Sequence, residues 1–176
     1  MRVINLATRS LLLGVVSAFA LAAQTTGTST LSLNIPAEAS ITITTPTTNL
    51  TAASAFAPYT GTTGFSFSIR TSVSGGTGSI QLKITSDFTP SGGPSVGTPP
   101  TAGDLLTYGC NASTGTACSG SQTASTTVST PVVVFGADAH SPTAGASGTV
   151  SWSLTNDTIY KSGSYNATAT FTISAT

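Results

Sequence analysis

The C-terminal part of the sequence alternates strictly between apolar and polar uncharged side chains. From residue 164 to residue 175, Tyr, Ala, Phe or Ile occupies every odd position, and Ser, Asn or Thr occupies every even position. Side chains of a β-strand point alternately to the two faces of its sheet, whereas an α-helix repeats every 3.6 residues. This segment therefore predicts a long strand with one face in a hydrophobic core and the other in water.

The same period of two recurs along most of the chain. It predicts further strands over residues 30–35, 40–45, 64–73, 78–88, 105–110, 125–135 and 148–156. No window has the period of a helix, and the connections are rich in Gly, Pro, Ser and Thr. About eight strands with turns between them indicate an all-β fold, a single antiparallel β-sandwich of immunoglobulin-like type. The short Ser-Gly-Gly-Thr turn at residues 74–77 predicts that its two flanking strands pair as a hairpin.

The first 23 residues have the composition of a secretory signal peptide. Arg2 and Arg9 precede an apolar run from Leu11 to Ala23, and small residues follow at the spacing of a cleavage site. The run is shorter than the about 20 residues that a membrane span needs. We therefore expect residues 1–23 to be removed and residues 24–176 to form one exported β-sandwich domain without a membrane span. Its expected location is the periplasm, the cell surface or the medium of a bacterium.

The two cysteines, Cys110 and Cys118, lie close together in the sequence. An exported protein meets an oxidising environment, so a structural disulfide between them is expected. A metal site would need further ligands nearby, and a redox site would favour a Cys-x-x-Cys spacing. Neither pattern is present at this place in the sequence.

Charged residues make up only 6% of the chain, against about 25% in an average soluble domain. Without a basic surplus, nucleic-acid binding is not expected. The chain has one His and no Gly-x-Ser-x-Gly motif, and the pair Asp138 and His140 supplies too few ligands for a metal. We expect a non-catalytic protein with no catalytic residues, no metal and no cofactor.

The predicted strands themselves contain very few charges. Arg70 and Lys83 are the only basic residues within them, although natural proteins usually protect exposed edge strands with Lys, Pro or inward-pointing charges. One interpretation is that copies of this chain associate edge to edge through strand addition. The other is that Ser and Thr simply cover the solvent face of each sheet.

The ending of the chain resembles the last strand of chaperone–usher pilus subunits. A glycine at the position of Gly163, a tyrosine at Tyr165 and alternating apolar residues through Phe171 and Ile173 are similar to the archaic branch related to spore coat protein U. The resemblance implies a sandwich that lacks one strand. A periplasmic chaperone would first fill the gap by binding near Phe171 and Ile173, and an usher would be the second partner.

The same resemblance assigns a role to the stretch after the signal peptide. It implies that Leu31, Leu33 and Ile35 form a donor strand that enters the next subunit and joins the subunits into a surface fibre. Two alternatives remain open at this level. Residues 30–35 could be an ordinary first strand, and about eight strands could complete a sandwich within one chain.

A second function is a secreted binding module or adhesin for glycans or surfaces. Tyr59, Tyr108 and Tyr160 lie near predicted loops and could supply aromatic contacts for such a ligand. Trp152 alternates with Val150 in a strand pattern, so its indole is expected in the core. The sequence therefore predicts either an exported structural subunit that binds its own neighbours or a binding module.

Overall fold

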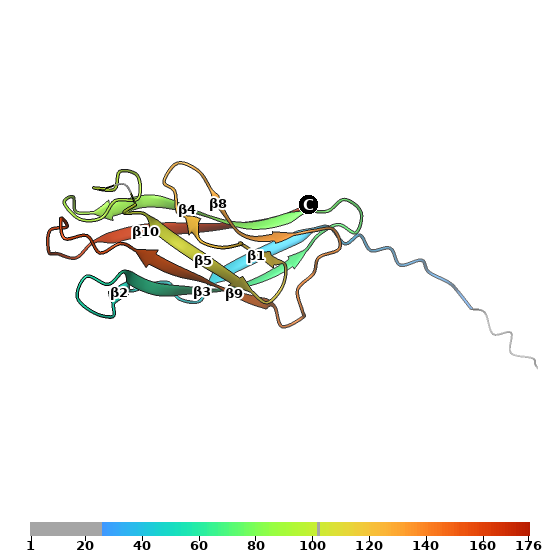
Figure 1. The fold of residues 1–176 in the computed structure, drawn as a ribbon. Helices are drawn as coiled ribbons and strands as arrows, with labels where there is room; N and C mark the ends of the chain where they lie inside the picture. Colours follow the sequence, from blue (N-terminus) through green and yellow to red (C-terminus); the bar gives the residue numbers. More distant parts are fainter. Residues whose placement is uncertain (1–25, 102) are drawn as a thin grey trace, which may run out of the picture. The chain divides into compact units, whose positions relative to one another are not determined.

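The computed structural model describes residues 26–101 and 103–176, and the predicted signal peptide lies outside these residues. Residues 35–176 form one compact unit built from two antiparallel sheets (Figure 1). The described residues contain no helix, which confirms the all-β prediction. They contain ten strands, because three strands of two residues each join seven of the eight strands that the sequence predicts, and residues 30–35 form none.

The two sheets face each other across the core. The first sheet has the order β1–β3–β9–β5–β7, with β2 also paired to β3, and the second has the order β10–β4–β8–β6. The strands of the first sheet are β1 (Glu38–Ile43), β2 (Thr51–Ala52), β3 (Tyr59–Arg70), β5 (Leu106–Ala112), β7 (Gln122–Thr123) and β9 (Ala146–Leu154). The strands of the second sheet are β4 (Gly78–Thr89), β6 (Thr116–Ala117), β8 (Thr130–Phe135) and β10 (Asn166–Ala175).

The core consists of the inward-facing residues that the alternation predicts. Burial alternates along β9, along β3 from Thr63 and along β4 up to Ile84. The large side chains buried in this way are Phe65, Phe67, Ile69, Ile80, Leu82, Ile84, Val150, Trp152 and Leu154. The Trp152 indole N–H donates a hydrogen bond of 2.8 Å to Thr63 Oγ1, so its one polar atom is satisfied. The prediction that Trp152 packs in the core is confirmed.

The predicted hairpin across residues 74–77 is wrong. β3 belongs to the first sheet and β4 to the second, so the turn carries the chain over the end of the sandwich. The Thr71 hydroxyl donates to the Gly136 carbonyl at 2.7 Å, and the Ser72 N–H donates to the Thr176 carbonyl at 3.0 Å. The alternation of apolar and polar residues identifies each strand, but it does not identify the neighbours of that strand. A short turn can connect two strands of one sheet, as in a hairpin, or two strands of different sheets.

The strand predicted over residues 125–135 is shorter in the structure and begins at Thr130. Its pairing with β4 shifts register between Ile80 and Gln81. Because of this irregularity, the consecutive residues Val132 and Val133 are both fully buried, while Val134 is 53% exposed.

The neighbouring residues Val133 and Val134 give a matched test of the core. Val133→Ala removes two buried methyl groups and should lower the free energy of unfolding of residues 24–176 by about 2 kcal/mol. Val134→Ala makes the same change on the exposed face and should alter it by less than about 0.5 kcal/mol. Urea unfolding measures both, and equal losses would contradict the assignment of the two faces.

Candidate functional site

The two lateral margins of the sandwich differ in how they are closed. The first sheet ends in β1 on one side and β7 on the other, and the second ends in β10 and β6. We call the side of β6 and β7 the closed margin. We call the side where β1 and β10 lie against each other the open seam, defined by Glu38–Ile43 and Asn166–Ala175.

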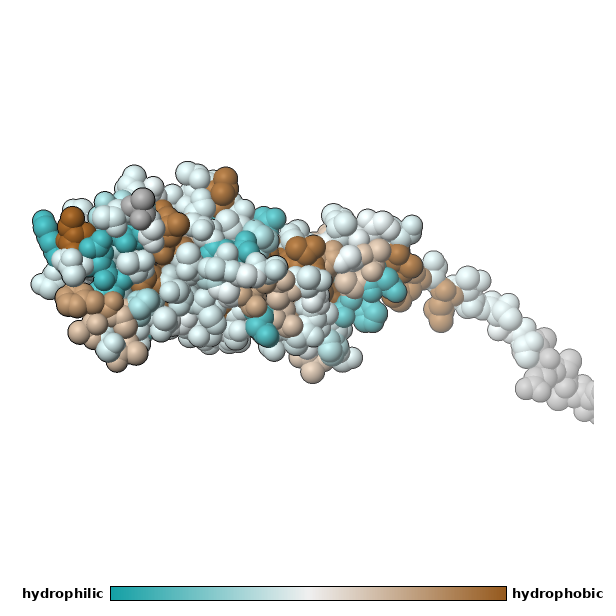
Figure 2. All heavy atoms as spheres, in the orientation of Figure 1, coloured by the Kyte–Doolittle hydropathy of each residue, from teal (hydrophilic) through white to brown (hydrophobic). Residues whose placement is uncertain are grey.

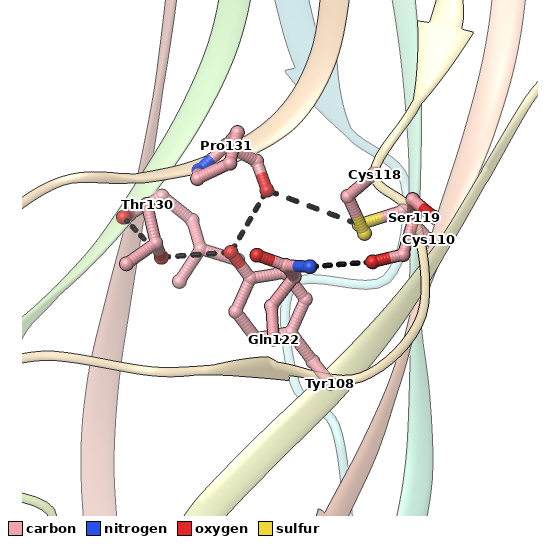
Figure 3. The surroundings of a disulfide bond; sticks show 8 residues. Tyr108, Cys110, Cys118, Ser119, Gln122, Thr130 and Pro131 are labelled. Atoms are coloured by element: carbon pink, nitrogen blue, oxygen red, sulfur yellow. Dashed lines mark hydrogen bonds between the residues drawn. A yellow bond between two sulfur atoms is a disulfide. The ribbon is translucent and has the colours of Figure 1, made fainter.

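The closed margin is held by strand switching and by a disulfide. From β5 to β8 the chain alternates between the first and second sheets, so covalent connections repeatedly cross this side. Cys110 in β5 is bonded to Cys118, which follows β6, with their Cα atoms 5.4 Å apart (Figure 3). The Cys118 N–H donates to the Val132 carbonyl at 2.9 Å. The predicted disulfide is confirmed, and it ties one sheet to the other.

Removal of this disulfide should destabilise the domain without abolishing the fold. In the chain-entropy model a loop of this length contributes about 2.6 kcal/mol. The double variant Cys110→Ala/Cys118→Ala should lose about 2–3 kcal/mol of unfolding free energy in urea. The wild-type domain in reducing buffer serves as the control and should match the variant. A variant as stable as the oxidised wild type would contradict this role.

At the open seam the apolar interior reaches the surface. None of the inward-facing residues of β1 or β10 is fully buried, in contrast to those at the centre of β3, β4 and β9. The partly buried apolar residues of the seam that pack against the core are Ala39, Ile41, Ile43, Ala169, Phe171, Ile173 and Ala175. The Phe171 ring centroid lies 5.8 Å from that of Phe65, so the seam is continuous with the core.

The two strands of the open seam also have unpaired backbone edges. Within the described residues, β1 pairs only with β3 and β10 pairs only with β4. β1 and β10 approach within 8 Å between Cα atoms, yet no ladder joins them. Two rows of N–H and C=O groups are therefore available to another strand. Alternation predicted both strands, but it did not predict that they are edges of the same margin.

Almost no charge protects this seam. The outward face of β10 carries Asn166, Thr168, Thr170, Thr172 and Ser174. The hydroxyls of Thr170 and Thr85 lie 2.8 Å apart, so this face bonds within its own sheet. The charged residue of β1 is Glu38, which pairs with Arg70 at 3.1 Å. Figure 2 shows a mostly pale surface, the colour of Ser, Thr and Gly, with few strongly hydrophilic areas.

Both ends of β10 are anchored although its free edge is uncovered. At its C-terminal end the Thr176 N–H donates to the Thr77 carbonyl at 2.8 Å. Before its first residue, the Tyr165 hydroxyl donates to the Lys161 carbonyl at 2.7 Å. A Cβ on Gly93 would lie 2.3 Å from the Tyr165 ring, so this tyrosine packs directly on the loop after β4. A side chain at Gly163 would meet Tyr165 only at an ordinary 3.6 Å, so packing does not require glycine there.

The segment before β1 belongs to no strand. Residues 26–37 have no regular secondary structure in the structure. Leu31 is 96% exposed, Leu33 is 82% exposed and Ile35 is 59% exposed. The alternative that residues 30–35 are an ordinary first strand of their own sandwich is therefore wrong. Three apolar side chains with a period of two remain in water, which is unfavourable unless another surface covers them.

Asp87 organises the long loop that follows β4. Its carboxylate accepts hydrogen bonds from the Ser95 hydroxyl at 2.6 Å and from the N–H groups of Val96 and Phe88, both at 2.8 Å. Partial burial raises the pKa of this carboxyl, but the hydrogen bonds outweigh that effect and hold it below the ordinary 3.8. The Asp87 carboxylate thus makes these hydrogen bonds within its own loop.

The shift makes a pH-dependent contribution to stability. A carboxyl whose pKa is lowered on folding stabilises the fold above its ordinary pKa of 3.8, and this contribution is lost as the pH falls through the folded value. At pH 7, Asp87→Asn should lower the unfolding free energy by about 1 kcal/mol, and the difference from wild type should shrink below pH 3.8. Asp138→Asn is the control, because no side-chain hydrogen bond involves the Asp138 carboxylate among the described residues. A difference that is independent of pH would contradict the assignment.

The three tyrosines that the sequence places near loops differ in burial. Tyr108 is fully buried beside Trp152, with ring centroids 5.6 Å apart, and its hydroxyl donates to the Pro131 carbonyl at 2.9 Å. It cannot reach a ligand as the sequence suggested, because it faces the core from β5. Tyr59 and Tyr160 are half-buried. Burial and the nearby carboxylates of Asp104 and Asp157 raise the pKa of Tyr160 to about 12.

The remaining acidic residues and the histidine make local contacts. Asp104 and Asp157 both lie near the Thr101 hydroxyl, at 3.2 Å for Asp157. His140 is exposed, and its Nδ1 lies 2.9 Å from the Asp138 carbonyl oxygen. No group of three His, Cys, Asp or Glu residues able to hold a metal occurs in the part of the chain that the structure describes.

Among residues 26–101 and 103–176 there is no helix with the length and apolar character to cross a membrane. No protein-family model, no curated protein and no solved structure matches the chain.

Proposed function

We propose that this chain is an exported, non-catalytic subunit of a surface fibre in which neighbouring copies are joined by a donated strand. The observation that carries the proposal is a complementary pair of defects in one chain. The open seam presents unpaired strand edges and partly exposed apolar side chains. The segment containing Leu31, Leu33 and Ile35 presents alternating apolar side chains and has no strand partner.

Strand addition would remove both defects at once. A strand laid along β10 forms a backbone ladder with its free edge, and alternate side chains enter the core. Burial of each of three large aliphatic side chains contributes about 1.5–3 kcal/mol. The donor surface and the acceptor surface are different, so the contact is heterologous and adds copies without closing. Such contacts build a fibre rather than a dimer.

The accompanying partners are implied by the resemblance of the last strand to chaperone–usher pilus subunits. A periplasmic chaperone that binds near Phe171 and Ile173 would cover the open seam before assembly, and an usher would be the second partner. The Cys110–Cys118 disulfide is compatible with an oxidising compartment. We infer export to the periplasm or cell surface and a role in adhesion through the fibre.

A second candidate is a secreted binding module for glycans or surfaces. Its support is a pair of exposed apolar side chains, Phe56 at 67% and Ile159 at 62%, on two loops. The Asn156 amide donates to the Ala57 carbonyl at 3.1 Å and joins these loops. A glycan array probed with the purified monomer tests this function, and an array without signal would weigh against it.

Deletion of the donor segment tests the fibre. Removal of Gln24–Ile35 should leave a folded monomer that does not polymerise, because the sandwich keeps its own core while losing the strand that it donates. Polymers are measured by sedimentation and electron microscopy of the concentrated protein. Unchanged polymers of the deletion variant would contradict the proposal, and so would a full-length exported chain that forms none.

Two point variants provide a matched control. Leu33→Asp places a charge on the apolar face of the donor segment and should reduce polymer yield at least about tenfold, since an unpaired charge is costly to bury. Ser32→Asp places the same charge on the opposite face and should leave most polymer intact. Circular dichroism and urea unfolding should show the same fold for both variants. Equal polymer yields would exclude an alternating donor strand.

A further inference from the structure

We propose that a cleft at the end of β3 binds a sugar that carries a carboxylate, such as a uronic acid unit of a glycan. The cleft lies between β1, the end of β3 and residues 140–143 of the loop that connects β8 to β9, and its volume is about 380 Å³. Small-molecule sites usually have volumes of about 300–1,000 Å³. The cleft is formed by one copy of the chain, so this inference goes beyond the proposed fibre and does not depend on it.

Three chemically different side chains form a row across the outer face of the first sheet at this cleft. Glu38 in β1 is the register partner of Arg70 in β3, and Arg70 forms an isolated antiparallel bridge with His140. Directly opposed residues of an antiparallel pair point to the same face, with their Cβ atoms about 4.5–5.5 Å apart. The Arg70 guanidinium therefore has a carboxylate on one side and an imidazole on the other, and all three residues line the cleft.

The loop that carries His140 is fixed by the end of β3. The buried Thr71 hydroxyl donates a hydrogen bond of 2.7 Å to the Gly136 carbonyl and accepts one of 2.9 Å from the Ala139 N–H. Between these anchors Asp138 has a left-handed backbone with a φ of 55°, which is uncommon for a residue other than glycine. Such conformations persist where the surroundings hold them, and they are frequent at binding sites. His140 is thus placed beside Arg70 before any ligand binds.

Arg70 supplies the cation that a carboxylate needs. Its Nε donates to the Pro36 carbonyl at 3.0 Å, and its Nη2 donates to Glu38 Oε2 at 3.1 Å. Two of its five N–H donors are used in this way, so three have no partner among the described residues. The Arg70 side chain is 45% exposed, so a ligand can reach these donors. The planar guanidinium binds a carboxylate through two parallel hydrogen bonds, which a lysine cannot reproduce.

Glu38 and His140 add hydrogen-bond acceptors to the cleft. His140 Nδ1 lies 2.9 Å from the Asp138 carbonyl oxygen. A carbonyl oxygen only accepts, so Nδ1 carries the hydrogen and Nε2 of the neutral ring is an acceptor. The Glu38 side chain is 76% exposed, and its carboxylate has one hydrogen-bond partner, Arg70, among the described residues. Both groups can therefore accept hydrogen bonds from the hydroxyls of a ligand.

Small hydroxyl residues form much of the remaining lining of the cleft. They are Ser40 in β1, Ser68 in β3, and Ser141 and Thr143 in the loop. Each hydroxyl can donate one hydrogen bond and accept others, so this lining suits a ligand with several hydroxyls.

These groups together define the class of ligand. Arg70 favours an anion, but the Glu38 carboxylate at 3.1 Å from its Nη2 disfavours a group with two negative charges, such as a phosphate monoester. A carboxylate has a single charge and the planar shape that the guanidinium matches. A carboxylated sugar would place this group on Arg70 and its hydroxyls on Glu38, His140 and the serines. This is the chemistry of a uronic acid.

The cleft is separate from the exposed apolar side chains considered above for a binding module. Phe56 lies just before the first residue of β3, whereas Arg70 is its last residue. A strand of 12 residues is about 40 Å long, so the two surfaces lie at opposite ends of β3.

Saturation-transfer NMR tests the cleft, because it detects weak ligands and tolerates large assemblies. The exported chain, residues 24–176, can therefore be used whether or not it polymerises. The probes are methyl β-glucuronide, its neutral counterpart methyl β-glucoside, and acetate. The variants are Arg70→Gln, Arg70→Lys and His140→Ala. Lys83→Gln is the matched control, because it removes a cation from β4 in the other sheet. Circular dichroism and urea unfolding should show the same fold for all variants.

We expect methyl β-glucuronide to bind at least about tenfold more tightly than either other probe, because only this probe offers a carboxylate together with hydroxyls. Arg70→Gln should weaken its binding at least about tenfold, and Arg70→Lys should weaken it less, because lysine keeps the charge without the planar fork. His140→Ala should weaken binding about threefold through the loss of one hydrogen bond. Lys83→Gln should bind as the wild type does.

Several results would overturn the proposal. Equal binding of methyl β-glucoside would exclude recognition of the carboxylate by Arg70, and equal binding of acetate would exclude a sugar as the ligand. Equal losses with Arg70→Gln and Lys83→Gln would show that overall charge, not the cleft, attracts the probe. Binding of none of the probes to the wild-type chain would remove the site. The fibre is tested separately by polymer yield, so each of these results leaves that proposal unaffected.

Discussion

The unpaired edge of β10 is the feature on which the other properties of this sandwich depend. β10 contributes Phe171 and Ile173 to the core but has β4 as its one strand neighbour among the described residues. Its inward apolar side chains are only partly buried, and the hydrophobic core reaches the surface along this side. A sheet edge with free N–H and C=O groups and an apolar face attracts any strand of matching pattern. The chain carries such a strand pattern before β1, at Leu31, Leu33 and Ile35.

The rest of the domain confines this opening to one place. On the closed margin the chain crosses repeatedly between the sheets, and the Cys110–Cys118 disulfide fixes one of these crossings. Tyr165 and Thr176 anchor the two ends of β10 through hydrogen bonds to neighbouring loops. β10 is thereby held at both ends while its edge stays unpaired. A well-ordered edge loses less entropy on pairing than a flexible one does.

The scarcity of charged residues has different consequences for the outer face of β10 and for its edge. Composition alone was compatible with two interpretations, a solvated hydroxyl surface or edge-to-edge association. The hydroxyl residues of β10 and β4 do bond to each other across the outer face of the second sheet, as Thr85 and Thr170 do. They leave the edge itself without a Lys, a Pro or an inward charge to block a partner. The solvated hydroxyl surface therefore describes the outer face of β10, and the proposed edge-to-edge association concerns its unpaired edge.

The sequence by itself determined which residues form strands and which side of each strand is apolar, because a period of two is a local property of the chain. It also predicted the disulfide, since the chain has two cysteines and they have one possible pairing within it. It did not determine which strands are neighbours. The turn at residues 74–77 suggested a hairpin but connects two sheets, and Tyr108 seemed available near a loop but faces the core. Only the tertiary structure decided that β1 and β10 share a margin and that residues 30–35 form no strand. Such pairing depends on contacts between residues far apart in the chain, for which alternation carries no information.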